Sequence, residues 1–320
     1  MTFCGSRQRS LYHVVALFAL YTWTVLAFPG RFHPATATSA RGLKSLTQRF
    51  GKKLHKAVKD TVGDDLALLA HQDEIQEFLE SKSKESSSSL LENFHIQGWR
   101  WHTKSLARDA GRLHRLALKT DPESATTLKE ASDYVVDFNM VGLHRIEGNL
   151  FFPWMREKLV GGVPEKPALA KGFASAMDVL ESDRQTVADL GSTISKQALL
   201  ACDTQAPSSS RSDAIAEVAN QSAELQKVVQ KMMTIEDKFL VPAIGAIVRE
   251  REQKSFNNRV LRKLGLLDSR LHLVGMYETV WEENDSLEKE LFKQAIPGFT
   301  QQLIPRWKRK LYQPRTSMLE

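Results

Sequence analysis

The residues best suited to chemistry are a histidine and a glutamate inside an apolar, helix-forming segment. His144 and Glu147 are three positions apart, so on a helix they lie on the same face. Imidazole and carboxylate groups bind iron and manganese, and an isolated carboxylate is costly to bury unless a cation compensates its charge. The pair therefore predicts a metal site in a helical interior. The alternative is an ordinary core histidine held by hydrogen bonds.

An internal repeat adds a second glutamate at a matching position. Residues 143–153 align without gaps with residues 232–242, so that Glu147 matches Glu236. In each segment a proline follows the glutamate by six residues. A proline inside a helix costs about 3 kcal/mol and bends the helix. Two prolines in register therefore predict that both segments share one geometry.

Four long helical stretches would have to position these side chains. Helix-forming residues dominate from Asp64 onward, and no alternating strand pattern competes with them. The stretches cover about residues 90–119, 124–159, 167–201 and 213–249, and short loops rich in Pro, Gly or Ser separate them. About 30 residues at 1.5 Å per residue span about 45 Å. This pattern predicts an all-α, antiparallel (up-down-up-down) four-helix bundle.

Shorter segments flank the predicted bundle, which occupies residues 90–250. Residues 63–89 are expected to form a short helix and a Ser-rich linker. Residues 251–320 are expected to form a C-terminal helical extension, which Pro297 and Pro305 interrupt.

The sequences around these side chains resemble those of hemerythrin-like (HHE cation-binding) domains. The run from His144 to Pro153 is similar to the second-helix signature of that family, in which His and Glu precede an apolar pair and a proline. Residues 99–102, which end in His102, resemble the histidine-bearing first helix, and residues 236–242 resemble the fourth-helix motif. The resemblance covers residues 90–249 and implies an oxo-bridged di-iron centre held by histidines and bridging carboxylates. Such centres serve in oxygen binding and in iron or oxygen sensing.

Several ligand positions of that family carry other residues in this chain. Met233 stands opposite His144 in the repeat, Gly148 stands opposite Asp237, and Asp183 lies near an expected third-helix histidine. The candidate metal ligands that remain are His102, His144, Glu147, Glu236, Asp237 and Asp183. Two histidines with four carboxylates suit a reduced, mononuclear or dinuclear, iron or manganese site.

Two functions are compatible with these features. In the first, the bundle holds non-haem iron and binds or senses dioxygen or a related small ligand. In the second, it is a metal-free, degenerate bundle that acts as a scaffold for protein interaction or membrane-surface association. The sequence has no Gly-rich phosphate loop, catalytic triad or Cys-x-x-Cys motif that would favour an enzyme.

The N-terminal region has the composition of a targeting sequence. Arg7 and Arg9 precede an apolar run that ends in Val-Leu-Ala, which predicts a signal peptide over residues 1–27, with an uncleaved anchor as the alternative. Residues 28–62 begin with Phe and are rich in Ser, Thr, Arg and Lys, as in a transit segment. This order resembles the two-part presequences of algae with secondary plastids and predicts plastid delivery. Endomembrane delivery or secretion is the alternative.

The charge distribution argues against a nucleic-acid partner. The chain has 44 basic and 38 acidic residues, but ten of the basic residues precede the first acid, Asp60. The body therefore carries no strong positive field. Two segments are instead suited to contact with an anionic membrane surface: the basic amphipathic residues 43–58 and the basic, aromatic residues 303–315.

Overall fold

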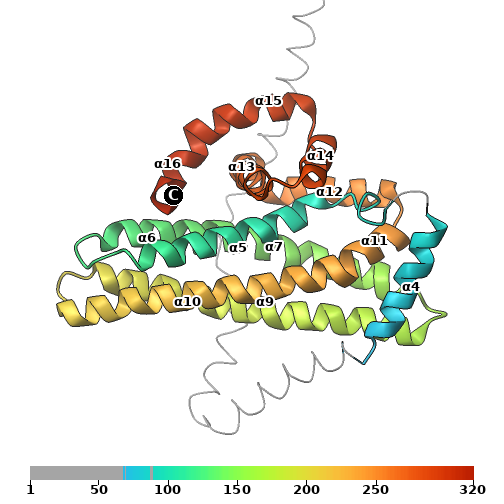
Figure 1. Ribbon diagram of the computed structural model, residues 1–320, viewed down its shortest axis with the longest axis horizontal. Coiled ribbons are helices and arrows are strands. Elements are labelled where there is room, and N and C mark those ends of the chain that lie inside the picture. Colours follow the sequence, from blue (N-terminus) through green and yellow to red (C-terminus); the bar gives the residue numbers. More distant parts are fainter. Residues whose placement is uncertain (1–67, 69, 87–88) are drawn as a thin grey trace, which may run out of the picture. The chain divides into compact units, whose positions relative to one another are not determined.

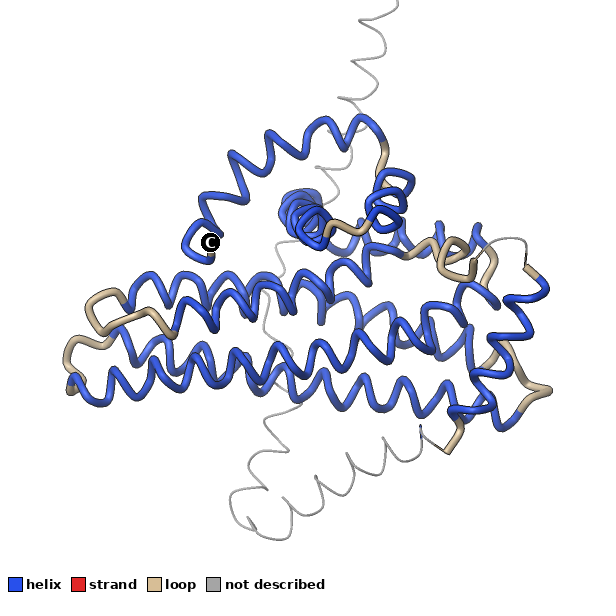
Figure 2. The backbone as a smooth tube through the Cα atoms, in the orientation of Figure 1, coloured by secondary structure: helices blue, strands red, loops and turns tan. Residues whose placement is uncertain are grey.

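Every regular element in the described part of the chain is a helix, which confirms the predicted all-α class (Figures 1 and 2). The computed structural model describes residues 68, 70–86 and 89–320. All of these belong to one compact unit, Asp60–Glu320. The predicted signal peptide, transit segment and basic amphipathic helix lie outside the described residues.

Four long helical stretches make up most of the body. The first and third are the unbroken helices α5 (Gln97–Ala117) and α9 (Pro167–Cys202). The other two alternate between α-helical and π-helical turns. The second consists of α6 (Ala125–Asp133), η1 (Tyr134–Met140), α7 (Val141–Ile146), η2 (Glu147–Phe151), α8 (Phe152–Met155) and η3 (Arg156–Val160). The fourth consists of α10 (Ser208–Ile235), η4 (Glu236–Leu240) and α11 (Val241–Ile247).

The ends of these helices follow from local sequence. The first stretch begins at Gln97, whereas the sequence predicts a start near residue 90. The side-chain amide of Gln97 donates to the backbone carbonyls of Leu91 and Phe94, and these hydrogen bonds hold the preceding residues in a turn. The third begins at Pro167, since a first helical position does not need the N–H that proline lacks. The fourth begins at Ser208, directly after a proline, and includes Ser-rich residues that the sequence predicts as loop.

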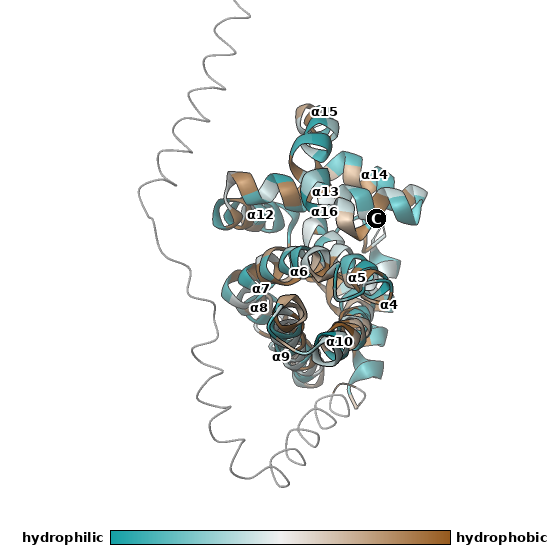
Figure 3. Cartoon of the chain, turned by 90° about the vertical axis from the view of Figure 1, so that its left-hand side faces the viewer, coloured by the Kyte–Doolittle hydropathy of each residue, from teal (hydrophilic) through white to brown (hydrophobic). Residues whose placement is uncertain are grey.

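The four stretches pack side by side around a shared apolar core (Figures 1 and 3). Helix α10 contacts α9 and α5, and α6 contacts the same two helices, so each stretch has two neighbours among the others. In α5 the buried residues Leu106, Ala110, Leu113 and Ala117 recur at helical spacing, which places them on one face. Burying one such leucine contributes about 1.5–3 kcal/mol. Packing of apolar faces therefore holds the long helices together.

Further helices of the C-terminal region cover one side of this body (Figure 3). They are α12 (Glu250–Leu264), α13 (Leu266–Glu283), α14 (Ser286–Ala295), α15 (Gly298–Trp307), η5 (Lys308–Tyr312), α16 (Gln313–Thr316) and η6 (Ser317–Leu319), while α4 (Gln72–Glu85) precedes the first long stretch. Helices α13 and α14 contact α5, and α12 contacts α7. The rings of Trp101, Tyr277, Trp281 and Phe292 pack together between α5, α13 and α14. None of the helices that the structure describes combines the length and apolar character needed to span a bilayer.

Both glutamates of the internal repeat begin a π-helical turn. The Phe152 N–H donates to the Glu147 carbonyl, and the Val241 N–H donates to the Glu236 carbonyl, each five residues back. A proline follows directly in each case. In a regular α-helix its ring would collide with the carbonyl four residues earlier, and the wider turn relieves that collision. The two segments therefore share one geometry, as their prolines predict.

A third proline has the same effect far from the repeat. The turn Lys308–Tyr312 is π-helical, the Gln313 N–H donates to the Lys308 carbonyl, and Pro314 follows. No carboxylate begins this turn. A π-helical turn before a proline therefore also forms where no carboxylate begins it, and this geometry is not by itself a sign of metal binding.

Candidate functional site

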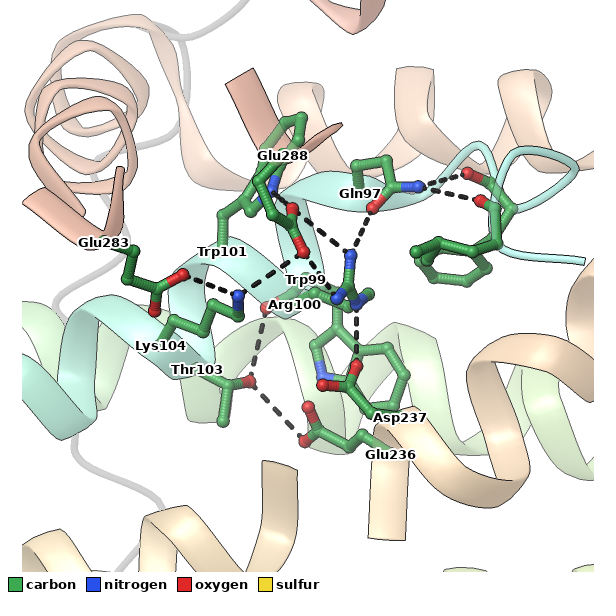
Figure 4. A network of polar contacts seen from close by, with 12 residues as sticks. Gln97, Trp99, Arg100, Trp101, Thr103, Lys104, Glu236, Asp237, Glu283 and Glu288 are labelled. Atoms are coloured by element: carbon green, nitrogen blue, oxygen red, sulfur yellow. Dashed lines mark hydrogen bonds and ion pairs between the residues drawn. The ribbon is translucent and has the colours of Figure 1, made fainter. Parts of the chain in front are cut away.

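Glu147 and Glu236 are two fully buried acids of the interior. Glu147 Oε1 accepts a hydrogen bond of 3.0 Å from Trp99 Nε1, whereas its Oε2 is buried and has no hydrogen-bond partner among the described residues. Glu236 Oε1 accepts a long hydrogen bond of 3.5 Å from Thr103 Oγ1 (Figure 4). No lysine or arginine that the structure describes forms an ion pair with either carboxylate. Neither carboxylate is therefore compensated by a direct ion pair, although the charge of Arg184 acts to lower the pKa of Glu147 and that of Arg100 acts to lower the pKa of Glu236.

The protein interior weakens both acids. Burial raises the pKa of Glu147 to about 7, although the Trp99 hydrogen bond and the positive charge of Arg184 oppose this rise. Burial also raises the pKa of Glu236 well above its usual value, and the negative charge of Glu147 adds to the effect. Because two buried negative charges disfavour each other, a proton or a cation would stabilise the pair.

His144 lies one helical turn before Glu147 and has an unpartnered nitrogen. Its Nε2 is buried without a hydrogen-bond partner among the described residues. Burial, together with the positive charge of Arg184, lowers the pKa of His144 to about 3. The imidazole is therefore neutral at physiological pH, which is the form that binds metals.

Arg184 is a charged residue near this pair that the sequence analysis does not single out. It lies on α9, and a Cβ added at Gly148 would fall 2.7 Å from its Nη1, so the missing side chain of Gly148 leaves room for the guanidinium. The same guanidinium lies 5.8 Å from the centroid of the Phe152 ring. In the sequence, the only indication of a role for Arg184 is that it directly follows the candidate ligand Asp183.

His102 is engaged by a chain of hydrogen bonds rather than by the two glutamates. Its Nε2 lies 3.0 Å from Asn139 Oδ1, and Asn139 Nδ2 donates to Asp109 at 2.9 Å. Since the Asn139 amide donates to a carboxylate on one side, its oxygen accepts from His102 on the other. Burial lowers the pKa of His102 to about 4. The ring of His272, from α13, lies 4.4 Å away.

Two predicted ligands form ion pairs. Asp183 pairs with Lys231 at 3.1 Å. Asp237 pairs with Arg100 at 2.7 Å, and Arg100 also pairs with Glu288 on α14 at 2.7 Å (Figure 4). Both aspartates therefore already have a positive partner, and neither needs a metal ion to compensate its charge.

The six predicted ligands fall into two sets. His144 and Glu147, from the second stretch, each have a buried polar atom without a hydrogen-bond partner among the described residues. Glu236, from the fourth stretch, accepts the long hydrogen bond from Thr103. His102, Asp183 and Asp237 are engaged by other side chains. Within the described ranges, no three or more His, Cys, Asp or Glu side chains form a group that could hold a metal ion in their present positions.

Comparison with known proteins adds no further assignment. No family model matches the chain, and no curated protein and no solved structure matches it.

Proposed function

We propose that the four long stretches form an antiparallel, up-down-up-down bundle of the hemerythrin type, and that this bundle holds one non-haem metal ion through Glu147, Glu236 and His144. Iron is the preferred metal. The observation that carries the proposal is the pair of buried glutamates at matching positions of the internal repeat. Two such carboxylates without an ion-paired lysine or arginine need another source of positive charge.

The bundle assignment is supported by connectivity. The loops between successive long stretches are short, and each stretch contacts two of the others. Long helices joined by short loops run in opposite directions, and side chains from facing helices then meet in the interior. Glu147 comes from the second stretch and Glu236 from the fourth.

The chemistry of the three side chains fits iron or manganese. Two carboxylates and one neutral imidazole are the oxygen and nitrogen donors that these metals prefer. Trp99 donates to Glu147 and Thr103 donates to Glu236, and such outer hydrogen bonds orient ligands in metal sites. Adjustment of these side chains from their present positions would be needed to bring the three donors together.

Non-haem iron supplies the capacity to bind dioxygen or a related small ligand. The chain contributes a dry surrounding for it, because Phe151 and Phe152 are both fully buried beside Glu147. The proposed role is therefore oxygen or iron binding, or sensing, rather than catalysis of a group transfer.

Metal analysis of the purified full-length chain tests this role. We expect about one iron per chain after anaerobic incubation with ferrous iron, followed by removal of unbound metal. Glu147→Gln and Glu236→Gln should each abolish retention, because each substitution keeps the shape of the side chain but removes a charged ligand. His144→Ala should weaken retention.

Asp237→Asn is the matched control, since Asp237 is the neighbour of Glu236 but pairs with Arg100. Its iron content should equal that of the wild type. Absence of metal from the wild-type protein, or equal metal in the Glu147→Gln variant, would contradict the proposal.

The second candidate, a metal-free scaffold, is favoured by a different observation. Arg184 reaches the space beside Gly148 and acts on the charge of Glu147. A guanidinium there, with a proton retained on the glutamate pair, would stabilise the interior without a metal. In that case Arg184→Gln would destabilise the metal-free protein, and iron would give no thermal stabilisation.

A further inference from the structure

The junction between α12 and α13 exposes two leucines to solvent. Leu261 is 52% exposed and Leu267 is 68% exposed. They flank Gly265, whose φ of 79° favours glycine and which separates the two helices. The buried face of α12 is formed by other residues, among them Phe256 and Leu264. The two exposed leucines are therefore not required by the core.

The same junction carries more positive than negative charge. No acid occurs between Glu252 and Asp268. Arg262 and Lys263 are exposed and form no ion pair with any described residue. Asp268 is paired with Arg145 at 3.6 Å, which reduces its effect on the surrounding field.

Further exposed cations lie near the end of the chain. The Arg270 guanidinium lies 5.9 Å from the centroid of the Trp307 ring. Beyond Trp307, the exposed residues Arg309 and Lys310 belong to a stretch without acids between Glu290 and Glu320. The segment that follows α15 and contacts α13 therefore adds further exposed cations to the C-terminal region.

We propose that Leu261, Arg262, Lys263 and Leu267, here called the leucine-basic turn, dock on an anionic lipid surface. In such binding the leucines enter the boundary between headgroups and acyl chains, while the cations remain at the level of the phosphates. The turn offers aliphatic groups next to cations. Nucleic-acid surfaces instead use stacking aromatics or base-reading polar groups.

A local probe separates this surface from the basic N-terminal residues of the same chain. Leu267→Cys is labelled with an environment-sensitive dye in a full-length chain that carries Cys4→Ser and Cys202→Ser. With vesicles of phosphatidylcholine and phosphatidylserine, the emission should increase and shift to the blue. Vesicles of phosphatidylcholine alone should have little effect, because charge attraction is lost. The same label at Leu199→Cys, a residue 61% exposed near the end of α9, should remain unchanged.

Paired substitutions provide a second measurement. Leu261→Ser with Leu267→Ser should weaken co-sedimentation with the anionic vesicles by on the order of tenfold or more, given the apolar area that leucines bury. Leu118→Ser with Leu199→Ser removes leucines of comparable exposure elsewhere and should have no effect. Arg262→Gln with Lys263→Gln should weaken binding most at low salt.

An unchanged emission at position 267, or equal sedimentation of the two leucine pairs, would overturn the proposal. Retention on heparin without vesicle binding would do the same and would indicate a polyanionic macromolecule as the partner. None of these measurements depends on bound metal, so their outcome is independent of the proposed metal site.

Discussion

At the scale of single residues, the interior combines acids that favour a bound proton with histidines that stay neutral. Burial raises the pKa of Glu147 and lowers the pKa of His102 and His144. These shifts act on stability in opposite directions. The raised pKa of the acid favours the folded state at low pH, whereas the lowered pKa of each histidine disfavours it as the pH falls below 6.5.

Glu147→Gln measures the contribution of the glutamate pair, because the histidines are common to both proteins whereas Glu236 responds to the charge of Glu147. A rise of the carboxyl pKa from 4.5 to about 7 gives on the order of 3 kcal/mol of stability that is present below pH 4.5 and lost as the pH rises through 7. The glutamine stays neutral at every pH. The free energy of unfolding of the variant, relative to that of the wild type, should therefore increase by up to that amount between pH 4.5 and pH 8.

Urea unfolding in the presence of a chelator, at pH 5 and at pH 8, measures this difference. Asp237→Asn is again the control, and its stability relative to the wild type should change less between the two pH values. A Glu147→Gln difference that is constant with pH would show that the carboxyl group does not titrate in this window.

At the scale of elements, one attachment of the C-terminal helices to the long helices is the side chain of His272, on α13, which packs against Phe138 and His102. Its ring stacks on the Phe138 ring, with 4.3 Å between the centroids and 9° between the ring planes. The His102 ring is also close, with 4.4 Å between its centroid and that of His272. Gly142 provides the space, because a Cβ there would overlap the His272 imidazole. The fit of α13 to the body therefore depends on a residue without a side chain.

Gly142→Ala should destabilise the protein by about 1–3 kcal/mol, because the His272 ring is stacked and buried and has little room to move. Thermal or urea unfolding checks the value. Gly98→Ala, also within a helix, meets no atom within 4 Å and should be neutral or slightly stabilising. Equal effects of the two substitutions would mean that the packing of His272 is not limiting.

A second attachment of the C-terminal helices is the buried carboxylate of Glu288. It pairs with Arg100 at 2.7 Å, accepts from Trp101 Nε1 at 2.8 Å, and contacts Lys104 at 3.4 Å (Figure 4). Arg100 in turn pairs with Asp237, the residue beside Glu236. The position of α14 is thereby connected to the start of the π-helical turn η4.

Glu288→Ala should cost about 3–5 kcal/mol, because it leaves the buried Arg100 guanidinium with one fewer anionic partner. Urea unfolding measures the cost, and proteolysis near the end of α13 should become faster. Glu290→Ala, on the same helix but exposed, is the control and should change stability by less than about 0.5 kcal/mol. Similar losses for both would contradict a specific role of the Glu288 contacts.

At the scale of the whole molecule, the sequence predicts the helices, which depend on neighbouring residues, but not the contacts between residues that are far apart in the chain. Helical periodicity and the proline and glycine punctuation were enough for the all-α class and the order of the long helices. The equivalence of Glu147 and Glu236 was also predictable, since a proline at fixed spacing produces the same π-helical turn in both. Contacts such as Arg100 with Glu288 join residues far apart in the chain, and no local pattern encodes them.

The candidate site shows the same division. The sequence indicates which polar residues fall on apolar faces, but not which partner satisfies each one. His102 was a metal candidate on that basis, and only the structure places Asn139 against it. Arg184 was missed because a charged residue on a long helix is usually solvated, and its proximity to Gly148 is a property of packing between helices.

The complete burial of Glu147 and Glu236 has a kinetic consequence. Anything that exchanges with this interior, whether a proton, an ion or a chelator, must wait until the helices part, and such local openings occur at a rate set by the protein alone. The release of a metal bound there would therefore become independent of chelator concentration once the chelator is in excess. The half-time of release would then measure how often the second and fourth helical stretches separate.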